Sequence, residues 1–374
     1  MIISGIGWHG YSLPFRRRYV SAGSAASRRF GLLVFISTSE GITGMGEASP
    51  VGVGSLAGVD AIVSALLKIA PRLLNHIDAA ERFIVEGLPP ALSFGLETAL
   101  RDIRGQSARV SLTALFGGRP SQLAVNAVII SESPEQAASE ARAALKSGFS
   151  CVKLKVGSGT LEREEEMVAA VRRAVGPDMR IRLDANQAWS VEQAIESIRC
   201  LAKYDLEYVE QPVAANDVAG MAKVRRAVSI PLAADESLGS IVDLHHILDA
   251  GAADVFIIKA ARLGGFRKSL RIAKEAAERG HPVVVTTALE SGIGIAASAH
   301  LAAAIPSQTK AHGLATGFLL EDDLLSVKWA PADGFLQVPT GPGLGVKVNA
   351  ASLRKYSSGI IGSVGSLSGL EEYL

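Results

Sequence analysis

The stretch Val152-Lys153-Leu154-Lys155-Val156 decides how the central part of this 374-residue chain folds. Apolar and charged residues alternate in it with a period of two, which is typical of a β-strand whose two faces differ. The apolar face is expected to pack on helices, so both lysines should point into the interior of the structure. Interior ammonium groups are costly unless they are paired or functional. Lys153 and Lys155 are therefore candidate functional residues.

Further apolar segments follow this strand at regular intervals, with amphipathic stretches of helical pattern between them. The predicted strands are 124–130, 151–156, 180–183, 208–210, 232–234, 254–258, 283–286 and 311–314. Alternation of strand and helix predicts parallel strands joined by right-handed crossovers. Eight such strands fit a closed (β/α)₈ barrel. A doubly wound sheet, the alternative, should carry a glycine-rich dinucleotide turn after its first strand, and the sequence has none there.

The regions on either side of this repeating pattern differ from it. Residues 30–38 and 41–47 are predicted to form an antiparallel hairpin, and helices are predicted over 60–74 and 92–108. From about residue 334 the tail returns to a strand-like pattern. The expected fold class is therefore α/β. We expect an α+β capping domain over 1–122, the barrel over 123–333, and a C-terminal segment over 334–374 that returns to the cap.

Four more charged residues fall at the ends of successive predicted strands. Asp184, Glu210, Asp235 and Lys259 follow one another at intervals of roughly 25 residues, one strand–helix unit each. In a barrel, chemistry takes place at the carboxyl ends of the strands. Three carboxylates brought together there would repel one another, and a divalent cation removes that repulsion. Oxygen-only ligands favour Mg²⁺, with Mn²⁺ as a substitute.

Lysines on both sides of such a metal site suit one kind of chemistry, the removal of a proton from a carbon beside a carboxylate. Each residue alone has an ordinary structural explanation, because an aspartate at a strand end often caps a helix and Lys259 could serve as an ion-pair partner. The structural explanation does not account for all of these residues falling in phase with the strand–helix period.

These strand ends resemble the motifs of the muconate-lactonizing subgroup of the enolase superfamily. The matching segments are Val152-Lys153-Leu154-Lys155, Asp184-Ala185-Asn186, Val209-Glu210-Gln211-Pro212, Ala234-Asp235-Glu236-Ser237 and Ile258-Lys259-Ala260-Ala261-Arg262-Leu263-Gly264-Gly265. The resemblance implies that Asp184, Glu210 and Asp235 bind Mg²⁺. It also implies that Lys155 is the main acid and base, that Lys153 tunes it, and that Lys259 lies on the opposite face of the substrate.

The resemblance alone leaves the reaction open, because the family contains epimerases, racemases, cycloisomerases and dehydratases. The stretch His312-Gly313-Leu314-Ala315-Thr316 is similar to that of the o-succinylbenzoate synthases, the dehydratases of menaquinone biosynthesis. Dipeptide epimerases place an acidic pair on this strand to bind the substrate ammonium. Here the strand has no carboxylate, which argues against dipeptides because a buried ammonium would lack a partner.

The resemblance therefore implies that Lys155 removes the proton and that a hydroxyl group is then lost, a syn dehydration. N-succinylamino acid racemization, dipeptide epimerization and muconate cycloisomerization stay open as alternatives. Outside the family, so do a phosphate-binding aldolase barrel and a non-enzymatic binding barrel.

Candidate substrate contacts come from the segment after the seventh predicted strand and from the cap. Ser291 and the backbone N–H of Gly292 are expected to bind the succinyl carboxylate of the substrate, although a glycine there also suits a tight turn. The remaining candidates are Asn186, Glu290 and, in the cap, Arg28. The small-residue segment 21–27 is expected to be a loop that closes over the substrate.

Composition bounds the expected partners and location. Lys and Arg number 38 against 37 Asp and Glu, which leaves a net charge of +1. This balance favours a small molecule over nucleic acid as the partner, and the resemblance implies that this small molecule is a carboxylate. The two cysteines lack C-x-x-C spacing, which predicts a reducing compartment and no disulfide. Without a secretory pattern or a run of about 18 apolar residues, a cytoplasmic protein with no membrane span is expected. The resemblance implies homo-oligomers as a family tendency, but the sequence indicates no particular assembly.

Overall fold

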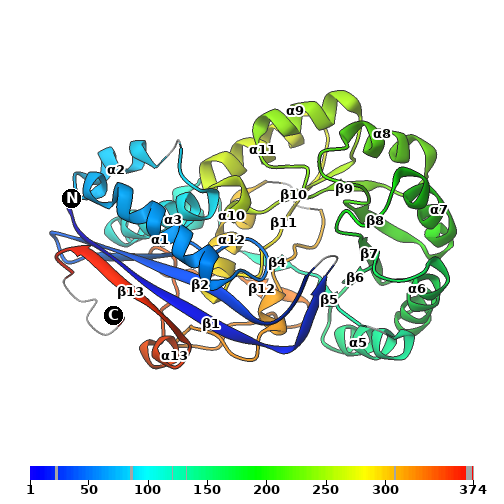
Figure 1. The fold of residues 1–374 in the computed structure, drawn as a ribbon, viewed down its shortest axis with the longest axis horizontal. Coiled ribbons are helices and arrows are strands. Elements are labelled where there is room, and N and C mark those ends of the chain that lie inside the picture. The colour runs from blue at the N-terminus through cyan, green and yellow to red at the C-terminus, as the bar shows by residue number, and fades with distance from the viewer. Residues whose placement is uncertain are drawn as a thin grey trace.

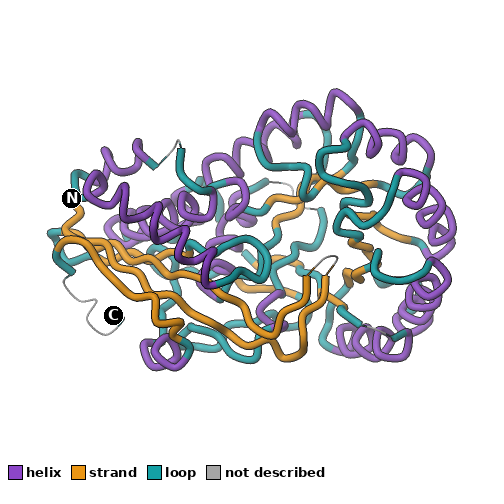
Figure 2. Tube along the Cα trace, in the orientation of Figure 1, coloured by secondary structure: helices purple, strands orange, loops and turns teal. Residues whose placement is uncertain are grey.

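The computed structural model describes residues 1–21, 24–84, 87–119, 121–131, 133–306, 309–367 and 373. Figure 1 shows two parts side by side: a long antiparallel sheet with helices on one face, and a curved layer of strands enclosed by helices. In Figure 2 the strands of the second part lie inside and the helices form an outer arc. None of the described helices is both long and apolar enough to cross a membrane.

The curved layer is a seven-stranded parallel sheet whose strands follow chain order. Its strands are β5 (Ala127–Ile129), β6 (Cys151–Lys155), β7 (Arg180–Asp184), β8 (Leu206–Glu210), β9 (Leu232–Ala234), β10 (Val255–Ile258) and β11 (Val283–Val285). The helices of this part are α5 (Pro134–Lys146), α6 (Leu161–Val175), α7 (Val191–Leu201), α8 (Val218–Ala227), α9 (Ile241–Ala250), α10 (Ala260–Leu263), α11 (Phe266–Glu278) and α12 (Gly292–Ala304). Seven of the eight predicted strands are thus confirmed, with shifts of a few residues at their ends.

The prediction of an eighth strand over 311–314 is wrong. His312 makes a single parallel bridge with Val125, and Gly313 makes one with Thr286, so the segment touches both edges of the sheet without forming a ladder. The His312 side chain explains part of this, because its Nδ1 accepts the N–H of Val285 at 3.1 Å in place of a backbone carbonyl. The chain then turns into a 3₁₀ helix, η2 (Thr316–Leu319).

Several helices of this seven-stranded part, which we call the barrel part or barrel below, begin where a side chain caps the first turn. The Ser133 hydroxyl accepts the N–H of Gln136 at the start of α5, where Pro134 is the first helical residue. Ser190 and Gln193 form a reciprocal capping box at the start of α7. Such side chains satisfy N–H groups that have no partner inside the helix, so these local sequences fix where each crossover helix begins.

The cap is built on a four-stranded antiparallel sheet of order β13–β1–β2–β3. Its strands are β1 (Ile3–Ser21), β2 (Ser24–Thr38), β3 (Thr43–Glu47) and β13 (Ser357–Gly365), and its helices are α1 (Leu56–Leu73), α2 (Ile77–Phe83) and α3 (Pro90–Ala108). The predicted hairpin of 30–38 with 41–47 is confirmed as β2 and β3. Pairing of β13 with β1 joins the C-terminal segment to the cap. The remaining short elements are α4 (Leu112–Leu115), β4 (Gln122–Ala124), η1 (Ala202–Tyr204), β12 (Phe335–Gln337) and α13 (Ala350–Lys355).

The two faces of the cap sheet bury different cores. Leu32 and Val34 of β2 pack with the cap helices, whereas Leu33 and Phe35 join the core that runs through the barrel. This follows from the period of two in a strand, which sends neighbouring side chains to opposite faces. The sheet is therefore a layer between cap helices and barrel, and it holds the cap against the barrel mouth.

The hairpin of β1 and β2 extends further than the sequence predicted. The expected loop at 21–27 is mostly strand, because β1 runs to Ser21 and β2 starts at Ser24; Ala22 and Gly23 lie outside the described residues. Figure 1 shows this ribbon reaching from the cap to the barrel side. An ion pair of Arg17 with Glu140 joins it to α5. The extra length places cap residues over the barrel mouth.

Candidate active site

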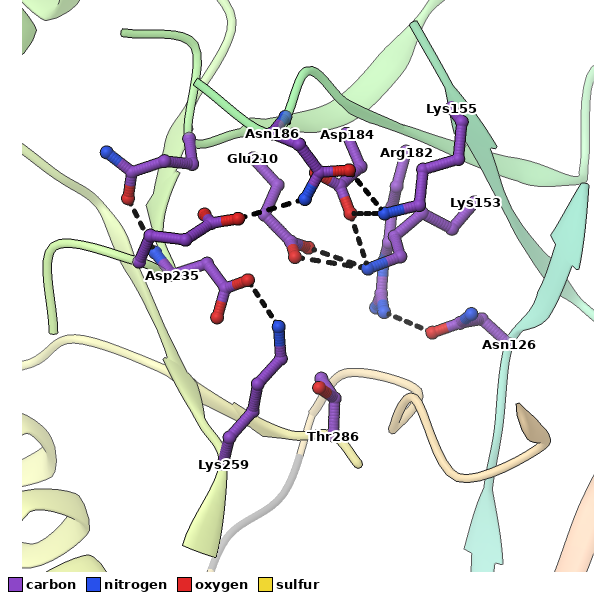
Figure 3. A network of polar contacts seen from close by, with 12 residues as sticks. Asn126, Lys153, Lys155, Arg182, Asp184, Asn186, Glu210, Asp235, Lys259 and Thr286 are labelled. Atoms are coloured by element: carbon purple, nitrogen blue, oxygen red, sulfur yellow. Dashed lines mark hydrogen bonds and ion pairs between the residues drawn. The ribbon is translucent and has the colours of Figure 1, made fainter. Parts of the chain in front are cut away.

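The charged residues predicted from their spacing meet at the carboxyl ends of the barrel strands (Figure 3). Lys153 and Lys155 lie on β6, and Asp184 and Glu210 end β7 and β8. Asp235 and Lys259 directly follow β9 and β10. All three carboxyl side chains are at most 1% exposed. Parallel strands end at one edge of the sheet, so a pattern spread over the sequence becomes a single cluster.

Ion pairs connect the lysines to the carboxylates. Lys153 Nζ lies 3.0 Å from Asp184 Oδ2 and 3.1 Å from Glu210 Oε1. Lys155 Nζ lies 2.7 Å from Asp184 Oδ2 and donates to Asn186 Oδ1 at 2.6 Å. In Figure 3, Lys155 and Lys259 approach the carboxylates from opposite sides.

Asp235 has its own pair of cations. Lys259 Nζ lies 2.5 Å from Asp235 Oδ2. Arg262 forms an ion pair with the same carboxylate and also donates to the backbone oxygen of Asp235 at 2.6 Å. Each ammonium or guanidinium of the cluster is therefore held by at least one buried carboxylate.

The pKa values show that the carboxylates compete for positive charge. Burial alone would raise the pKa of Asp184, but the ammonium groups of Lys153 and Lys155 hold it well below its usual range. Burial, and then the negative charge of Asp184, raise the pKa of Glu210 to about 7. Glu210 is thus the carboxyl group of the cluster whose negative charge is least compensated by its neighbours.

A divalent cation among the three carboxylates would compensate the charge of Glu210 directly. Within the described ranges, no three His, Cys, Asp or Glu side chains are already gathered around one point as metal ligands. The donor set nevertheless fits Mg²⁺, because Asp184, Glu210 and Asp235 offer buried oxygen atoms only. Glu236 adds a fourth carboxyl group, and its Oε2 is buried with no hydrogen-bond partner in the described part of the chain. Ammonium groups now contact oxygens that a cation could bind instead.

A cavity of about 200 Å³ opens above the cluster. Its charged and amide lining consists of Lys153, Lys155, Asp184, Asn186, Glu236, Lys259 and Arg262. Residues of the barrel and cap complete it: Val128, Thr286, Thr287, Ala288, Leu289, Gly313, Thr316 and Leu319, with Tyr19, Val51, Gly52 and Val53 from the cap. The cavity is charged at its base and mainly apolar on the cap side, so it suits a carboxylate with a less polar extension.

The predicted substrate contacts fare differently. Asn186 lines the cavity and donates to Glu236 Oε1 at 2.9 Å. Ser291 and Gly292 do not line the cavity. Their donors are also already satisfied, since Ser291 Oγ donates to Glu47 at 2.6 Å and the Gly292 N–H donates to Asp323 at 2.8 Å. The expectation that these two residues offer free donors to the substrate is therefore not supported.

Glu290 and Arg28 also lie away from the cavity lining. Glu290 is 2% exposed, and one of its carboxylate oxygens accepts the N–H of Ala288. Arg28 is exposed and donates to the hydroxyl and the backbone oxygen of Ser12, each at 2.6 Å. Both side chains are thus engaged within the protein rather than directed at a substrate.

Sequence reasoning missed several cavity residues. Glu236 and Arg262 stood inside the quoted motifs, so their proximity to Asp235 was a usable signal. Val51 and Val53 come from a cap loop with no chemical pattern, and only the packing of cap on barrel brings them to the cavity.

Comparisons with known proteins agree with this architecture. Residues 136–352 match the model described as "Enolase C-terminal domain-like", and residues 14–117 match "Mandelate racemase / muconate lactonizing enzyme, N-terminal domain". The chain belongs to the enolase superfamily. The resemblance predicted from the strand-end motifs is therefore confirmed, and the two matches fall on the barrel and cap parts of this enolase superfamily member.

Its relatives in the superfamily carry out different reactions. The chain is 44% identical over 216 residues to an o-succinylbenzoate synthase of Thermobifida fusca, a match that covers 57% of this chain and 66% of the relative, just under two thirds of its length. It is 33% identical over 323 residues to a hydrophobic dipeptide epimerase of Enterococcus faecalis, covering 84% of this chain and 90% of the relative.

Among solved structures, one similar fold is a dipeptide epimerase from Cytophaga hutchinsonii complexed with Mg and the dipeptide D-Ala-L-Val. It superposes with a TM-score of 0.87 at 26% identity and covers 97% of this chain and 99% of its own. Membership of the enolase superfamily is thus clear, while these relatives differ in the reaction named for them.

Proposed function

We propose that this protein removes a proton from the carbon beside a carboxylate and then expels a hydroxyl group, giving o-succinylbenzoate. One observation carries the proposal: Lys155 and Lys259 line the same cavity from opposite sides of a buried carboxylate cluster. One face of a bound substrate would meet Lys155 and the other would meet Lys259. That arrangement suits general acid–base chemistry at a carbon held between them.

Asp184, Glu210 and Asp235 are the residues that would hold Mg²⁺, with Mn²⁺ as a substitute. The bound ion would supply positive charge that stabilises the negative charge developing on the substrate carboxylate. Lys155 Nζ is held by Asp184 and Asn186, which keeps it at the cavity surface. We assign it the removal of the proton and its later donation to the leaving hydroxyl, with Lys153 tuning it.

Lys259 has a different role in this proposal. It lies 2.5 Å from Asp235 and lines the cavity on the far side of the cluster. Its charge would favour the anionic form of the substrate without transferring a proton. The apolar side chains of the cap then exclude water from the reacting carbon.

Two observations favour dehydration over epimerization of dipeptides. In the 311–316 segment, the residues that line the cavity are Gly313 and Thr316, so an ammonium group bound there would have no carboxylate partner. The o-succinylbenzoate synthase of T. fusca shares 44% identity with this chain over the matched region, against 33% for the dipeptide epimerase of E. faecalis.

A second candidate is racemization or epimerization within the same superfamily, as in N-succinylamino acid racemases and dipeptide epimerases. Two lysines on opposite sides are all that this reaction requires of the chain, and the apolar wall of Val51, Val53 and Leu289 favours substrates with an apolar end. Muconate cycloisomerization is the third possibility that the fold allows.

The decisive experiment is a Mg²⁺-dependent assay of the hydroxylated cyclohexadiene carboxylate precursor beside N-succinyl amino acids and dipeptides. We expect turnover of the precursor, and a loss of about 10²- to 10⁴-fold in kcat for Lys155→Ala. Lys274→Ala, an exposed lysine on α11, is the control and should retain full activity. Turnover of another panel member without the precursor would refute the dehydratase assignment.

Several finer expectations accompany this proposal. They are closure of the barrel through residues 311–314, the boundaries at 122/123 and 333/334, a cytoplasmic location, and assembly as a homo-oligomer. Sedimentation of the purified protein tests the last of these directly.

A further inference from the structure

A carboxylate of the cap binds the start of a barrel helix. Glu47, the last residue of β3, is 1% exposed. Its Oε2 accepts the Ser291 N–H at 3.1 Å, the Ser291 hydroxyl at 2.6 Å and the Gly294 N–H at 3.1 Å. These groups belong to the first turn of α12, where N–H groups have no partner inside the helix. Glu47 therefore caps a helix that lies 244 residues further along the chain.

The other oxygen of Glu47 is held inside the cap. Tyr11 donates its hydroxyl to Oε1 at 2.5 Å, and Ser49 donates at 2.9 Å. One carboxylate thus accepts from five donor groups, two of the cap and three of the barrel. The fit is close, since a side chain on Gly294 would come within 3.1 Å of Glu47 Oε2.

Arg29 holds the turn that precedes this helix. It is fully buried in β2, and its Nε donates to the backbone oxygen of Leu289 at 2.8 Å. Leu289 has a φ of 71°, in the left-handed region that L residues rarely adopt. Such a conformation persists only where the surroundings impose it. Here Arg29 fixes one end of the Leu289–Ser291 turn and Glu47 fixes the other.

The turn matters because it forms part of the cavity wall. Leu289 lines the cavity beside Val51 and Val53 of the cap. Glu290, between the two held residues, is buried next to Glu47 and Arg29, whose charges act on its carboxyl group in opposite directions. Arg29 is therefore the cation that compensates this otherwise acidic pair.

We propose that Arg29 and Glu47 are positioning residues: from the cap, they hold the Leu289–Ser291 turn, and with it the cavity wall, in the shape that accepts substrate. The effect on catalysis rests on the proposed function, whereas the hold on the turn does not. The cap thus shapes the site through the barrel's own backbone as well as through the residues it places over the cavity.

Glu47→Gln is the sharpest test. The variant keeps the size of the side chain but has one acceptor oxygen, and its amide N–H would face the donors of Ser291 and Gly294. We expect faster hydrogen–deuterium exchange in peptides covering 286–297, and a KM raised about 10- to 100-fold with a smaller change in kcat. Glu47→Asp, which keeps two acceptors, should recover part of both losses.

Glu97→Gln is the matched control. Glu97 lies on α3 of the cap, and its carboxylate accepts the N–H of Phe266 at 2.8 Å at the start of another barrel helix, α11. It does not line the cavity. We expect both glutamine variants to lower the melting temperature, because each loses an acceptor that joins cap and barrel, but Glu97→Gln should leave KM and exchange at 286–297 unchanged.

The outcomes separate this inference from the proposed function. Equal KM values and equal exchange at 286–297 in the two variants would overturn the positioning role. Failure of the wild-type protein to turn over the precursor would overturn the dehydratase assignment alone. In that case the exchange measurement, which needs no substrate, still decides whether Glu47 holds the turn.

Discussion

Leu289 has a left-handed backbone conformation, in which glycine is the most common residue. The left-handed conformation costs an L residue about 1–2 kcal/mol, and glycine adopts it freely. Leu289 has a φ of 71° and is mostly buried. The protein therefore keeps a strained residue at the cavity wall, which indicates that its side chain matters there.

A pair of substitutions measures this strain. Leu289→Ala removes the side chain but keeps the φ requirement, whereas Leu289→Gly removes both. We expect the glycine variant to be more stable than the alanine variant by about 1 kcal/mol, the reverse of the usual order. Urea unfolding of both proteins provides the comparison. A glycine variant that is less stable than the alanine variant would show that the turn is not strained.

A buried histidine should make the fold sensitive to acid. His300 Nε2 donates to the Leu344 oxygen at 3.0 Å, and Nδ1 accepts from the Thr113 hydroxyl at 2.7 Å. Burial lowers the pKa of His300 to about 4. Because this folded-state pKa lies below the unfolded value of about 6.5, its contribution is complete above pH 6.5 and is lost as the pH falls towards 4.

The free energy of unfolding that is lost as His300 becomes protonated amounts to about 3 kcal/mol. His300→Gln retains a donor and an acceptor but does not titrate, so its stability should depend less on pH between 6.5 and 4. Urea midpoints across this range, for the variant and for the exposed His246→Gln, test the assignment. Parallel pH profiles of wild type and His300→Gln would rule it out.

At this scale the sequence predicted the charged cluster but not its surroundings. Spacing alone brought Lys155, Asp184 and Glu210 together, because the ends of parallel strands must meet. The same reasoning misplaced Ser291, whose donors are taken by Glu47. A partner 244 residues away on a different sheet leaves no local pattern in the sequence.

Among the elements, β3 and α3 approach each other unusually closely. A methyl group on Gly46 of β3 would overlap the backbone oxygen of Gly95 in α3, and one on Gly44 would overlap that of Ala99. Both obstructing atoms are backbone, so neither can rotate away. The glycines on alternate positions of β3 therefore set how near the strand, and Glu47 at its end, comes to the rest of the cap.

Gly46→Ala should consequently destabilise the protein by about 1–3 kcal/mol, the usual cost of overpacking a core. Gly159→Ala is the control, since a methyl group there meets nothing closer than 3.8 Å. Thermal unfolding compares the two variants. If Gly46→Ala melts with the wild-type protein, the strand and helix can separate without loss, and the close packing is not required.

The elements also show why one predicted strand failed. Residues 311–314 have a suitable apolar pattern, but the ring of His312 accepts the N–H of Val285 that a neighbouring strand would otherwise bind. The pattern of apolar residues indicates which face of a sheet a side chain lies on. It does not show which atom accepts the N–H group of a neighbouring strand. The long β1–β2 ribbon was underestimated for a related reason, because residues 24–27 have the composition of a loop, but Ser24, Ala25 and Ala26 pair with β1.

For the molecule as a whole, the cluster of three buried carboxylates predicts that a divalent ion stabilises the fold. A ligand that binds only the folded state adds about 2.7 kcal/mol when present at 100 times its Kd. We expect Mg²⁺ to raise the melting temperature by several degrees and EDTA to reverse the effect. Differential scanning fluorimetry over a range of Mg²⁺ concentrations measures it.

Two glutamates of β8 provide the specificity control. Glu210→Gln removes a proposed ligand and should abolish the response to Mg²⁺. Glu207→Gln changes a carboxylate near the other end of the same strand, where it pairs with Arg182 and Lys310, and should leave the response intact. An unchanged response in Glu210→Gln would remove this residue from the ligand set.

The overall organisation was predictable to the extent that it repeats. The strand–helix period identified the parallel sheet and the edge that carries the charged cluster, and the change of pattern at both ends of the chain separated the cap. The sequence does not show that β2 presents Leu33 and Phe35 to the barrel and Val34 to the cap helices, since both faces are equally apolar. Only the docked arrangement distinguishes the two faces.

The pairing of β1 with β13 has a consequence for how the protein is made. Synthesis proceeds at about 5–20 residues per second, so the roughly 350 residues that separate the paired positions take on the order of 20–70 seconds to emerge. For that time one edge of β1 has no partner from its own chain. Open strand edges pair readily with other chains. During synthesis the protein is thus exposed to aggregation at β1, and that exposure ends only when β13 has been made.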